Sequence, residues 1–240
     1  MIRLNRYIAS CGVCSRRKAD ELIQNGEIRV NDRTVLEPGI QVDPEKDRVF
    51  YRNKRLKPQE HTYFLFYKPP YVLSSCSRDP LYPDRKIITD FLPGNKRLFY
   101  VGRLDYDAEG LILLTNDGMT SQKLAHPRYE IEKKYRVLID KKLSPDEIAY
   151  LQKGFSHEGS HIFMKNIEPV GTKSGRYEYL VVLTQGIKRQ IKVMLDSINR
   201  RTLSIKRIAF GPLHLGDLKP GQFRPLSGKE KKELFRLAGK

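Results

Sequence analysis

The first sixty residues combine apolar positions at helical spacing with a short alternating stretch. One helix is predicted by Leu4, Tyr7, Ile8 and Cys11, which recur at helical period before Gly12. A second helix is predicted to begin after Ser15, a favoured N-cap residue, and to end at residues 25–26. Residues 28–30 then open a hairpin around an Asn-Asp turn, and the polar residues 52–60 have the composition of a linker. The pattern predicts a small α/β module over residues 1–60.

The remainder, residues 61–240, alternates strand-like and helix-like segments. Strands are predicted at 62–67, 72–74, 98–101, 111–115, 134–139, 178–184 and 205–210. Helices are predicted at 87–91, 119–125, 145–153, 189–197 and 229–238. This arrangement is typical of an α+β domain built on a mainly antiparallel mixed sheet flanked by helices.

The net charge of the chain indicates which class of molecule it binds. The chain has 45 Lys and Arg against 28 Asp and Glu, a formal charge of +17, and residues 170–240 alone hold 16 basic against 5 acidic side chains. An excess of this size indicates a polyanionic partner, nucleic acid before membrane. No long apolar run predicts a membrane span, and the first six residues do not resemble a signal peptide, so we expect a cytoplasmic protein.

Cysteine usage gives little sign of a metal. Cys11 and Cys14 have the spacing of a zinc knuckle, but no second Cys or His pair follows nearby, and the odd total of three argues against a disulfide framework. Reduced structural thiols and no metal are expected.

The segment 101–118 holds the most specific chemistry. An apolar run ends at Gly102, a polar loop carries Arg103 and Asp105, and a fully apolar strand resumes after Gly110. A reactive loop between two buried strands is a frequent geometry of active sites, although spacing alone also fits a solvated hairpin loop.

The identity of these residues favours the first interpretation. Gly102-Arg103-Leu104-Asp105, Gly110-Leu111 and Thr115–Gly118 together resemble the catalytic motif of the RsuA-type pseudouridine synthases, which isomerise uridine in RNA. The likeness extends over nearly the whole chain, and it implies a pseudouridine synthase domain over residues 61–240.

This resemblance assigns roles to further residues. It implies that Asp105 is the catalytic carboxylate, that Tyr135 stacks on the uracil, and that Lys192 is the cation paired with Asp105. Arg103 matches the arginine that fills the space left by the flipped nucleotide. Breaking and remaking a glycosidic bond in this way needs no redox step, so no cofactor is expected. Lys188 and Arg189, in a basic stretch that continues through Lys192, Arg200, Arg201, Lys206 and Arg207, can attract the RNA backbone.

The N-terminal module has its own resemblance. Its sequence is similar to the S-four-type RNA-binding module of ribosomal proteins and RNA-modifying enzymes. The residues that would meet phosphates are Arg3, Ser15, Arg16, Arg17 and Lys18.

The prediction of the substrate class depends on fewer residues than the prediction of the reaction does. Residues 79–85 are more similar to the RluB-like branch, which acts on large-subunit ribosomal RNA, than to enzymes of the small subunit, whereas Tyr71 stands where the family commonly has Gly. We therefore expect a monomeric enzyme that acts on large-subunit rRNA. The alternatives are an enzyme that acts on small-subunit rRNA or tRNA, and a non-catalytic RNA-binding protein of ribosome assembly. A glycosidase using Asp105 and Asp107 is disfavoured because neutral sugars do not call for a charge of +17.

Overall fold

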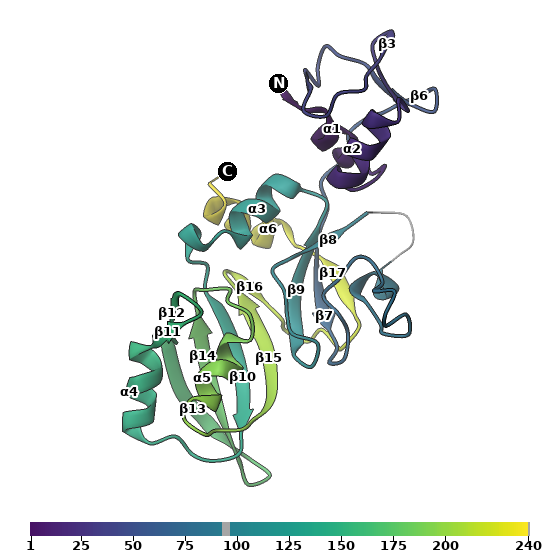
Figure 1. Ribbon diagram of the computed structural model, residues 1–240. Coiled ribbons are helices and arrows are strands. Elements are labelled where there is room, and N and C mark those ends of the chain that lie inside the picture. Colours follow the sequence, from purple (N-terminus) through teal and green to yellow (C-terminus); the bar gives the residue numbers. More distant parts are fainter. Residues whose placement is uncertain (93–96, 240) are drawn as a thin grey trace. The chain divides into compact units, whose positions relative to one another are not determined.

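The computed structural model describes residues 1–92 and 97–239 (Figure 1). Those residues form two compact units, which are described separately. The first consists of Met1–Thr62 with short additions that include Asn116–Gly118, and the second holds most of the chain from Tyr63 onward. Within the described residues, no helix has both the length and the apolar character that a membrane crossing needs.

The first unit packs two helices against small sheets. Its helices are α1 (Leu4–Ser10) and α2 (Arg16–Gln24). A four-stranded sheet has the order β3 (Arg33–Thr34), β2 (Ile28–Val30), β5 (Val49–Tyr51), β6 (Lys54–Arg55), and β1 (Ile2–Arg3) pairs with β4 (Gln41–Val42). The predicted helical faces form its core, in which Leu4, Ile8, Ala19 and Ile23 are fully buried.

The expected linker at residues 52–60 is partly wrong. Arg52 and Asn53 both have positive φ and make the two-residue turn between β5 and β6, a conformation that Asn tolerates well. Leu56, beyond β6, is 9% exposed and packs into the core of the first unit. The segment lacks apolar periodicity because its strand has only two residues.

A single large sheet organises the second unit. In the described residues its order is β13-β14-β10-β15-β9-β7-β17, with β16 beside β15 and β8 beside β9. The strands are β7 (Tyr63–Lys68), β8 (Phe99–Val101), β9 (Glu109–Thr115), β10 (Lys133–Ile139), β13 (Asn166–Lys173), β14 (Arg176–Leu183), β15 (Thr202–Phe210), β16 (Leu213–His214) and β17 (Phe223–Pro225). A separate hairpin joins β11 (Phe155–His157) to β12 (Ser160–Ile162).

Helices cover both faces of this sheet (Figure 1). The α-helices are α3 (Gly118–Ala125), α4 (Pro145–Lys153), α5 (Gln190–Asp196) and α6 (Gly228–Leu237), with 3₁₀ turns at Ile88–Phe91 and Pro127–Tyr129. Side chains of α4 and α5 join one hydrophobic core, and those of α3 and α6 join the other. The predicted α+β class with a mainly antiparallel sheet is confirmed.

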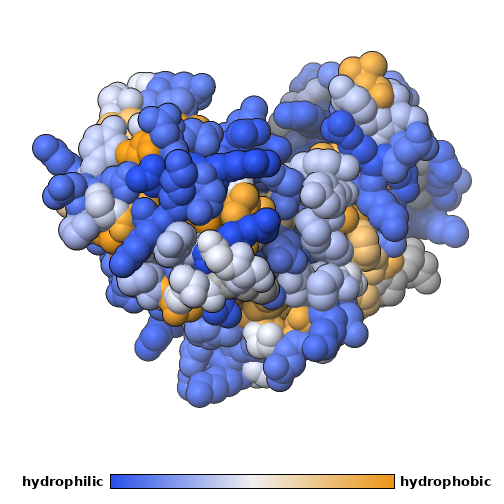
Figure 2. All heavy atoms as spheres, turned by 90° about the horizontal axis from the view of Figure 1, so that it is seen from below, coloured by the Kyte–Doolittle hydropathy of each residue, from blue (hydrophilic) through white to orange (hydrophobic). Residues whose placement is uncertain are grey.

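Burial of strand β9 on both faces of the sheet explains its apolar sequence. Ile112 and Leu114 point into the core that contains α4 and α5, whereas Leu111 and Leu113 point into the core that contains α3 and α6. A strand buried on both faces needs a continuous apolar run. Hydrophilic side chains predominate on the outer face shown in Figure 2, where hydrophobic ones form small separate groups.

Several features of the sheet differ from the sequence expectation, among them the unpredicted short strands β16 and β17. Residues 72–74 form no strand, and Leu73 makes only an isolated parallel bridge to Ile87. Strand β13, which carries Pro169 and Gly171 at a bulge, escaped prediction because these residues are rare inside strands.

Candidate active site

A cavity of about 350 Å³ opens beside the loop that joins β8 to β9. Its lining comes chiefly from the β8–β9 loop, the loop before α5 and the start of α5, and strands β10 and β15, with further residues from α3 and β14. It brings together five of the residues expected at the site: Arg103, Asp105, Tyr135, Lys188 and Arg189. These residues are up to 86 positions apart in sequence, so only the sheet can gather them.

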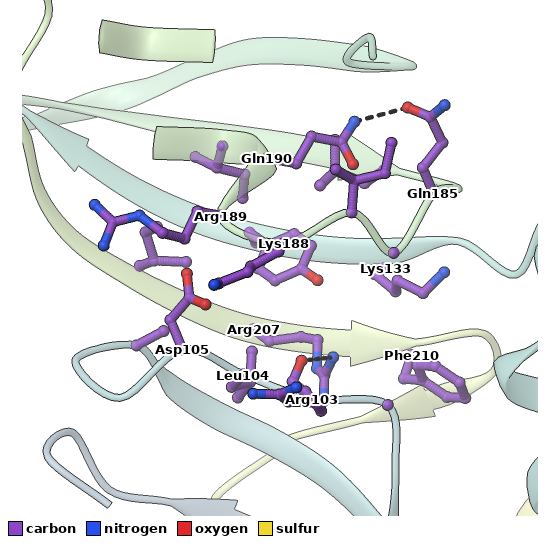
Figure 3. Close-up of a pocket in the computed structure, with 18 of the residues that line it drawn as sticks. Arg103, Leu104, Asp105, Lys133, Gln185, Lys188, Arg189, Gln190, Arg207 and Phe210 are labelled. Carbon is purple, nitrogen blue, oxygen red and sulfur yellow. Dashed lines mark hydrogen bonds between the residues drawn. The ribbon is translucent and has the colours of Figure 1, made fainter. Parts of the chain in front are cut away.

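Asp105 sits on a tight, well-supported loop. Gly102 turns the chain at a φ of 70° after β8, and Ala108 donates its N–H to the Asp105 carbonyl at 3.2 Å. The Asp105 residue is half-buried, and Figure 3 shows its carboxylate directed toward the loop that carries Lys188 and Arg189. One carboxylate therefore faces a cavity whose opposite wall is basic.

Gly110 allows the loop to rejoin the sheet next to β15. Strands β9 and β15 are parallel here, with Arg207 opposite Gly110. A Cβ at position 110 would lie 2.3 Å from the Arg207 carbonyl oxygen, and its φ is 111°. Only glycine fits this close approach of two backbones.

Tyr135 lies in the middle of β10, between β14 and β15. Its register partners are Val181 on one side and Arg207 on the other, with a β-bulge just before it. The side chain is only 7% exposed and lines the cavity, so its ring is fixed before any substrate binds. A fixed aromatic ring in a cavity wall is suited to stacking on a planar base.

Lys192 does not pair with Asp105. Its Nζ contacts both carboxylate oxygens of Asp107, at 2.5 Å from Oδ1. Partial burial alone would raise the pKa of the Asp107 carboxyl, but the hydrogen bond and charge of Lys192 outweigh it and lower that pKa. The expected Lys192–Asp105 pair is therefore corrected, because the turn at 105–108 presents the second carboxylate of the loop to α5. Lys192 also lies outside the residues that line the cavity.

Two buried cations hold the backbone of the Asp105 loop. Arg207 is 2% exposed, and its Nε donates to the Leu111 carbonyl at 2.7 Å. Its Nη1 donates to the Arg103 carbonyl at 3.4 Å, the contact drawn in Figure 3. Lys68 is fully buried, and its Nζ donates to the carbonyls of Tyr106 and Ala108 at 3.3 and 2.7 Å. The loop is thus held on both sides of Asp105.

Both roles were missed by the sequence analysis. The prediction that Arg207 belongs to the basic stretch facing RNA is wrong, because its side chain is buried under the loop. Lys68 is a lone charge at the end of an apolar strand and before two prolines, a signal that could have marked it as a buried cation. Burial lowers the pKa of Lys68 to about 8, although the charges of Asp107 and Asp105 oppose this.

Lys133 is a further cation in the cavity wall. Its Nζ donates to the carbonyls of Ile131 and Thr184, at 2.9 and 2.8 Å, and burial followed by the charge of Arg207 lowers its pKa to about 8. The family resemblance assigns a role to Tyr135 in the same string of residues but none to Lys133.

The loop before α5 is fixed by two glutamines. Gln190 Nε2 donates to Gln185 Oε1 at 2.8 Å, drawn in Figure 3, and to the Phe163 carbonyl at 2.9 Å. Arg189 adopts a left-handed φ of 56°, and both Lys188 and Arg189 remain accessible to solvent. Their side chains are therefore available at the cavity while the backbone beneath them is held.

In the first unit, the expected RNA-facing residues lie on the surface. Arg3, Arg16, Arg17 and Lys18 are exposed, and Lys18 also pairs with Glu21 at 2.6 Å. Ser15 caps α2, its Oγ accepting from the Lys18 N–H at 3.1 Å. These side chains are accessible to a phosphate backbone.

The three cysteines are free thiols. Cys11 packs against the core of the first unit, where burial raises the pKa of its thiol to about 11. In the part of the chain that the structure describes, no group of three or more metal-ligating side chains lies together.

The turn at Tyr71 keeps the shape that glycine would give it. Tyr71 takes a φ of 61°, and its N–H donates to the Tyr106 carbonyl at 2.7 Å. The family departure at this position therefore leaves the left-handed turn in place.

Comparison with known proteins agrees with this geometry. A family model described as RNA pseudouridylate synthase matches residues 62–197, and an S4 domain model matches residues 2–49. The chain is 36% identical over 99% of its length to Ribosomal large subunit pseudouridine synthase B of Bacillus subtilis, covering 97% of that protein. It is 30% identical over 98% of its length to the Dual-specificity RNA pseudouridine synthase RluF of Escherichia coli, covering 79% of it.

A solved structure supports the same assignment. The crystal structure of a pseudouridylate synthase superposes with a TM-score of 0.67 at 25% identity, over 98% of this chain and 100% of that one. The chain belongs to the RNA pseudouridylate synthase family, as an RNA isomerase that also carries an S4 domain.

Proposed function

We propose that this enzyme converts uridine to pseudouridine at a specific position of large-subunit ribosomal RNA. The observation that carries the chemistry is the half-buried Asp105 facing a cavity lined by Tyr135 and basic side chains. The name of the Bacillus subtilis relative supports the choice of the large subunit.

Asp105 is proposed to act at the ribose. In the reaction the C1′–N1 bond breaks, the uracil turns, and a C1′–C5 bond forms while the C5 proton is lost and N1 gains one. The Asp105 carboxylate promotes the first bond cleavage, either by attacking C1′ or by removing a ribose proton. Tyr135 holds the detached base by stacking. The reaction is redox-neutral, and no cofactor is proposed.

Lys192 is proposed to support catalysis through Asp107. By fixing Asp107, it sets the conformation of the turn that carries Asp105 two residues earlier. Arg103, exposed at the cavity, would fill the stack when the uridine leaves it, which offsets part of the few kcal/mol that base flipping costs.

RNA is proposed to contact both parts of the chain. Lys188 and Arg189 meet the backbone at the cavity, while residues 1–60 act as an RNA-binding module through Arg3, Arg16, Arg17 and Lys18, with Ser15 capping their helix. Residues 61–240 form the catalytic domain. The side chains of a single chain suffice to line the cavity, which supports action as a monomer.

Base-resolution mapping of pseudouridine in ribosomal RNA tests this proposal. One position of the large-subunit rRNA should contain pseudouridine in cells with the gene and uridine in cells without it. Purified protein should form pseudouridine at that position in transcribed RNA. A difference confined to the small subunit or to tRNA contradicts the proposed substrate. Unchanged maps, with RNA binding intact, would indicate a binding protein.

A further inference from the structure

A row of exposed aromatic side chains lies next to the catalytic loop but outside the cavity. Tyr106 directly follows Asp105 and is 37% exposed. Its ring meets Tyr71 edge-to-face at 5.8 Å, and the guanidinium of Arg85 lies 5.1 Å from its centroid. Arg85 in turn lies 3.9 Å over the ring of Tyr82. The row is therefore continuous: Tyr82, Arg85, Tyr106, Tyr71.

The row is built on fixed backbone. Arg78 donates from Nη1 to the carbonyls of Pro83 and Arg85, at 3.1 and 3.3 Å, and from Nη2 to Asp90 at 2.7 Å. The Tyr71 N–H binds the Tyr106 carbonyl, which ties the backbones of these two members of the row together. These contacts hold the backbone that carries the rings.

Large aromatic and aliphatic side chains in this segment are exposed to solvent, although such side chains are usually buried. Tyr71 is 66% exposed, Tyr82 48% and the neighbouring Leu81 80%. Tyr71 also occupies a left-handed φ of 61°, a conformation disfavoured for a residue with a bulky side chain. Backbone strain and large exposed rings beside an active site indicate a binding role more than a packing role.

We infer that this row is a stacking platform for unpaired nucleotides that flank the target uridine. Rings and a guanidinium plane are the groups that proteins use to stack unpaired bases, and Arg85 adds a positive charge for the neighbouring phosphate. The net charge of +17 makes RNA, and not an apolar protein surface, the complementary partner. The inference rests on the proposed action on RNA and specifies which part of the substrate meets this loop.

Tyr82→Trp tests the platform directly because the chain contains no tryptophan. The full-length variant is titrated with oligoadenylate, which stacks well and offers no uridine to the cavity. Quenching of the single tryptophan is expected. Tyr150→Trp is the matched control, since Tyr150 is 42% exposed, stacks on Phe155 and lies outside the row; its indole should not be quenched.

Affinity provides the second readout. Tyr82→Ala should weaken oligoadenylate binding about tenfold, whereas Tyr82→Phe, which keeps the ring, and Tyr150→Ala should bind as the unaltered chain does. A blunt RNA duplex should leave the indole of the Tyr82→Trp variant unquenched. The platform is refuted if that indole does not respond to oligoadenylate, if the duplex quenches it equally, or if Tyr82→Ala binds normally.

These measurements are independent of catalysis. Failure of the proposed function would appear as missing pseudouridine with oligoadenylate quenching unchanged. Failure of the platform would appear as absent quenching in a protein that still modifies rRNA.

Discussion

Lys192 forms its ion pair with Asp107, two residues beyond the carboxylate that faces the cavity. The loop therefore presents two acidic side chains to different surroundings. Asp107 is bound to the cation on α5, and Asp105 is left beside the cavity. Division of roles between two nearby carboxylates by their environment is a recurring device in enzymes.

This pairing predicts how a cation-free variant responds to pH. Lys192→Met should lower kcat about ten- to hundredfold by loosening the turn at Asp105. Loss of the lysine removes the contact that lowers the pKa of Asp107, but a higher pH cannot restore that contact, so the loss of activity should persist from neutral to alkaline pH. A pH–rate profile checks this: recovery at high pH would place Lys192 on Asp105 instead.

The same contact can be tested by a double-mutant cycle. Asp107→Asn should lower kcat by a factor similar to that of Lys192→Met, and the double variant should be no worse than either, because each change breaks one shared contact. Losses that multiply would mean that the two residues act independently.

Asp105→Asn should remove isomerisation while leaving the fold and RNA affinity intact. The amide keeps the shape of the side chain but supplies neither a nucleophile nor a base, so a loss of about a thousandfold or more is expected. Asp217→Asn, at an exposed position away from the cavity, is the matched control. Substantial pseudouridine formation by the Asp105 variant would exclude the assigned role.

Arg207→Met should affect both stability and catalysis. It leaves the carbonyls of Leu111 and Arg103 without their buried donor, which is expected to lower the free energy of unfolding by about 2–4 kcal/mol. Displacement of the Asp105 loop should lower kcat more than it raises KM. Chemical denaturation and steady-state kinetics measure these effects, with the neighbouring Lys206→Met as control, and equal behaviour of the two variants would contradict the role.

The buried Lys68 predicts a rise of stability in alkaline solution. Its pKa is about 8 in the folded chain against 10.5 for the ordinary side chain, so the unfolded chain binds more protons between these values. The free energy of unfolding should therefore rise as the pH increases from the folded value toward the unfolded one, by up to about 1.4 kcal/mol per pH unit from this group. Denaturation at several pH values checks this. Lys68→Met should make the rise smaller without removing it, because Lys133, whose pKa is also about 8, still contributes.

Gly110→Ala should prevent assembly of the sheet. The added methyl group meets the Arg207 backbone at 2.3 Å, where no flexible side chain can yield. Gly171→Ala, where nothing lies within 4 Å of the new Cβ, is the matched control. Thermal denaturation should show a large loss for the first variant and little change for the second.

Local patterns in the sequence account for much of the fold. Helix α4 matches its predicted range of 145–153 because Ser144, Pro145 and Glu147 give a complete start signal and Gly154 ends the helix. The apolar run of β9 is equally clear. In contrast, β6 and β17 are two- and three-residue strands that depend on their partners for definition, and no local pattern reveals them.

The candidate site, like the fold, could be predicted from the sequence only in part. The family resemblance identified Asp105 and Tyr135 as candidates, because each lies in a string that matches a family motif; spacing alone did not distinguish them from loop and core residues. The partner of Lys192 and the burial of Arg207 could not be read from the chain, since both depend on which strands lie side by side. A basic side chain in a strand has the same sequence signature whether it faces solvent or a carbonyl beneath a loop.

The parallel pairing of β9 with β15 has a consequence for biogenesis. Arg207 and Leu111 are 96 residues apart, so the loop with Asp105 gains its buried support only after the last third of the chain has joined the sheet. Such distant pairings form late and slowly in folding. Because synthesis runs from the N-terminus, the S4 domain of residues 2–49 is made before the strands that complete the cavity, and we expect catalytic competence to arise last.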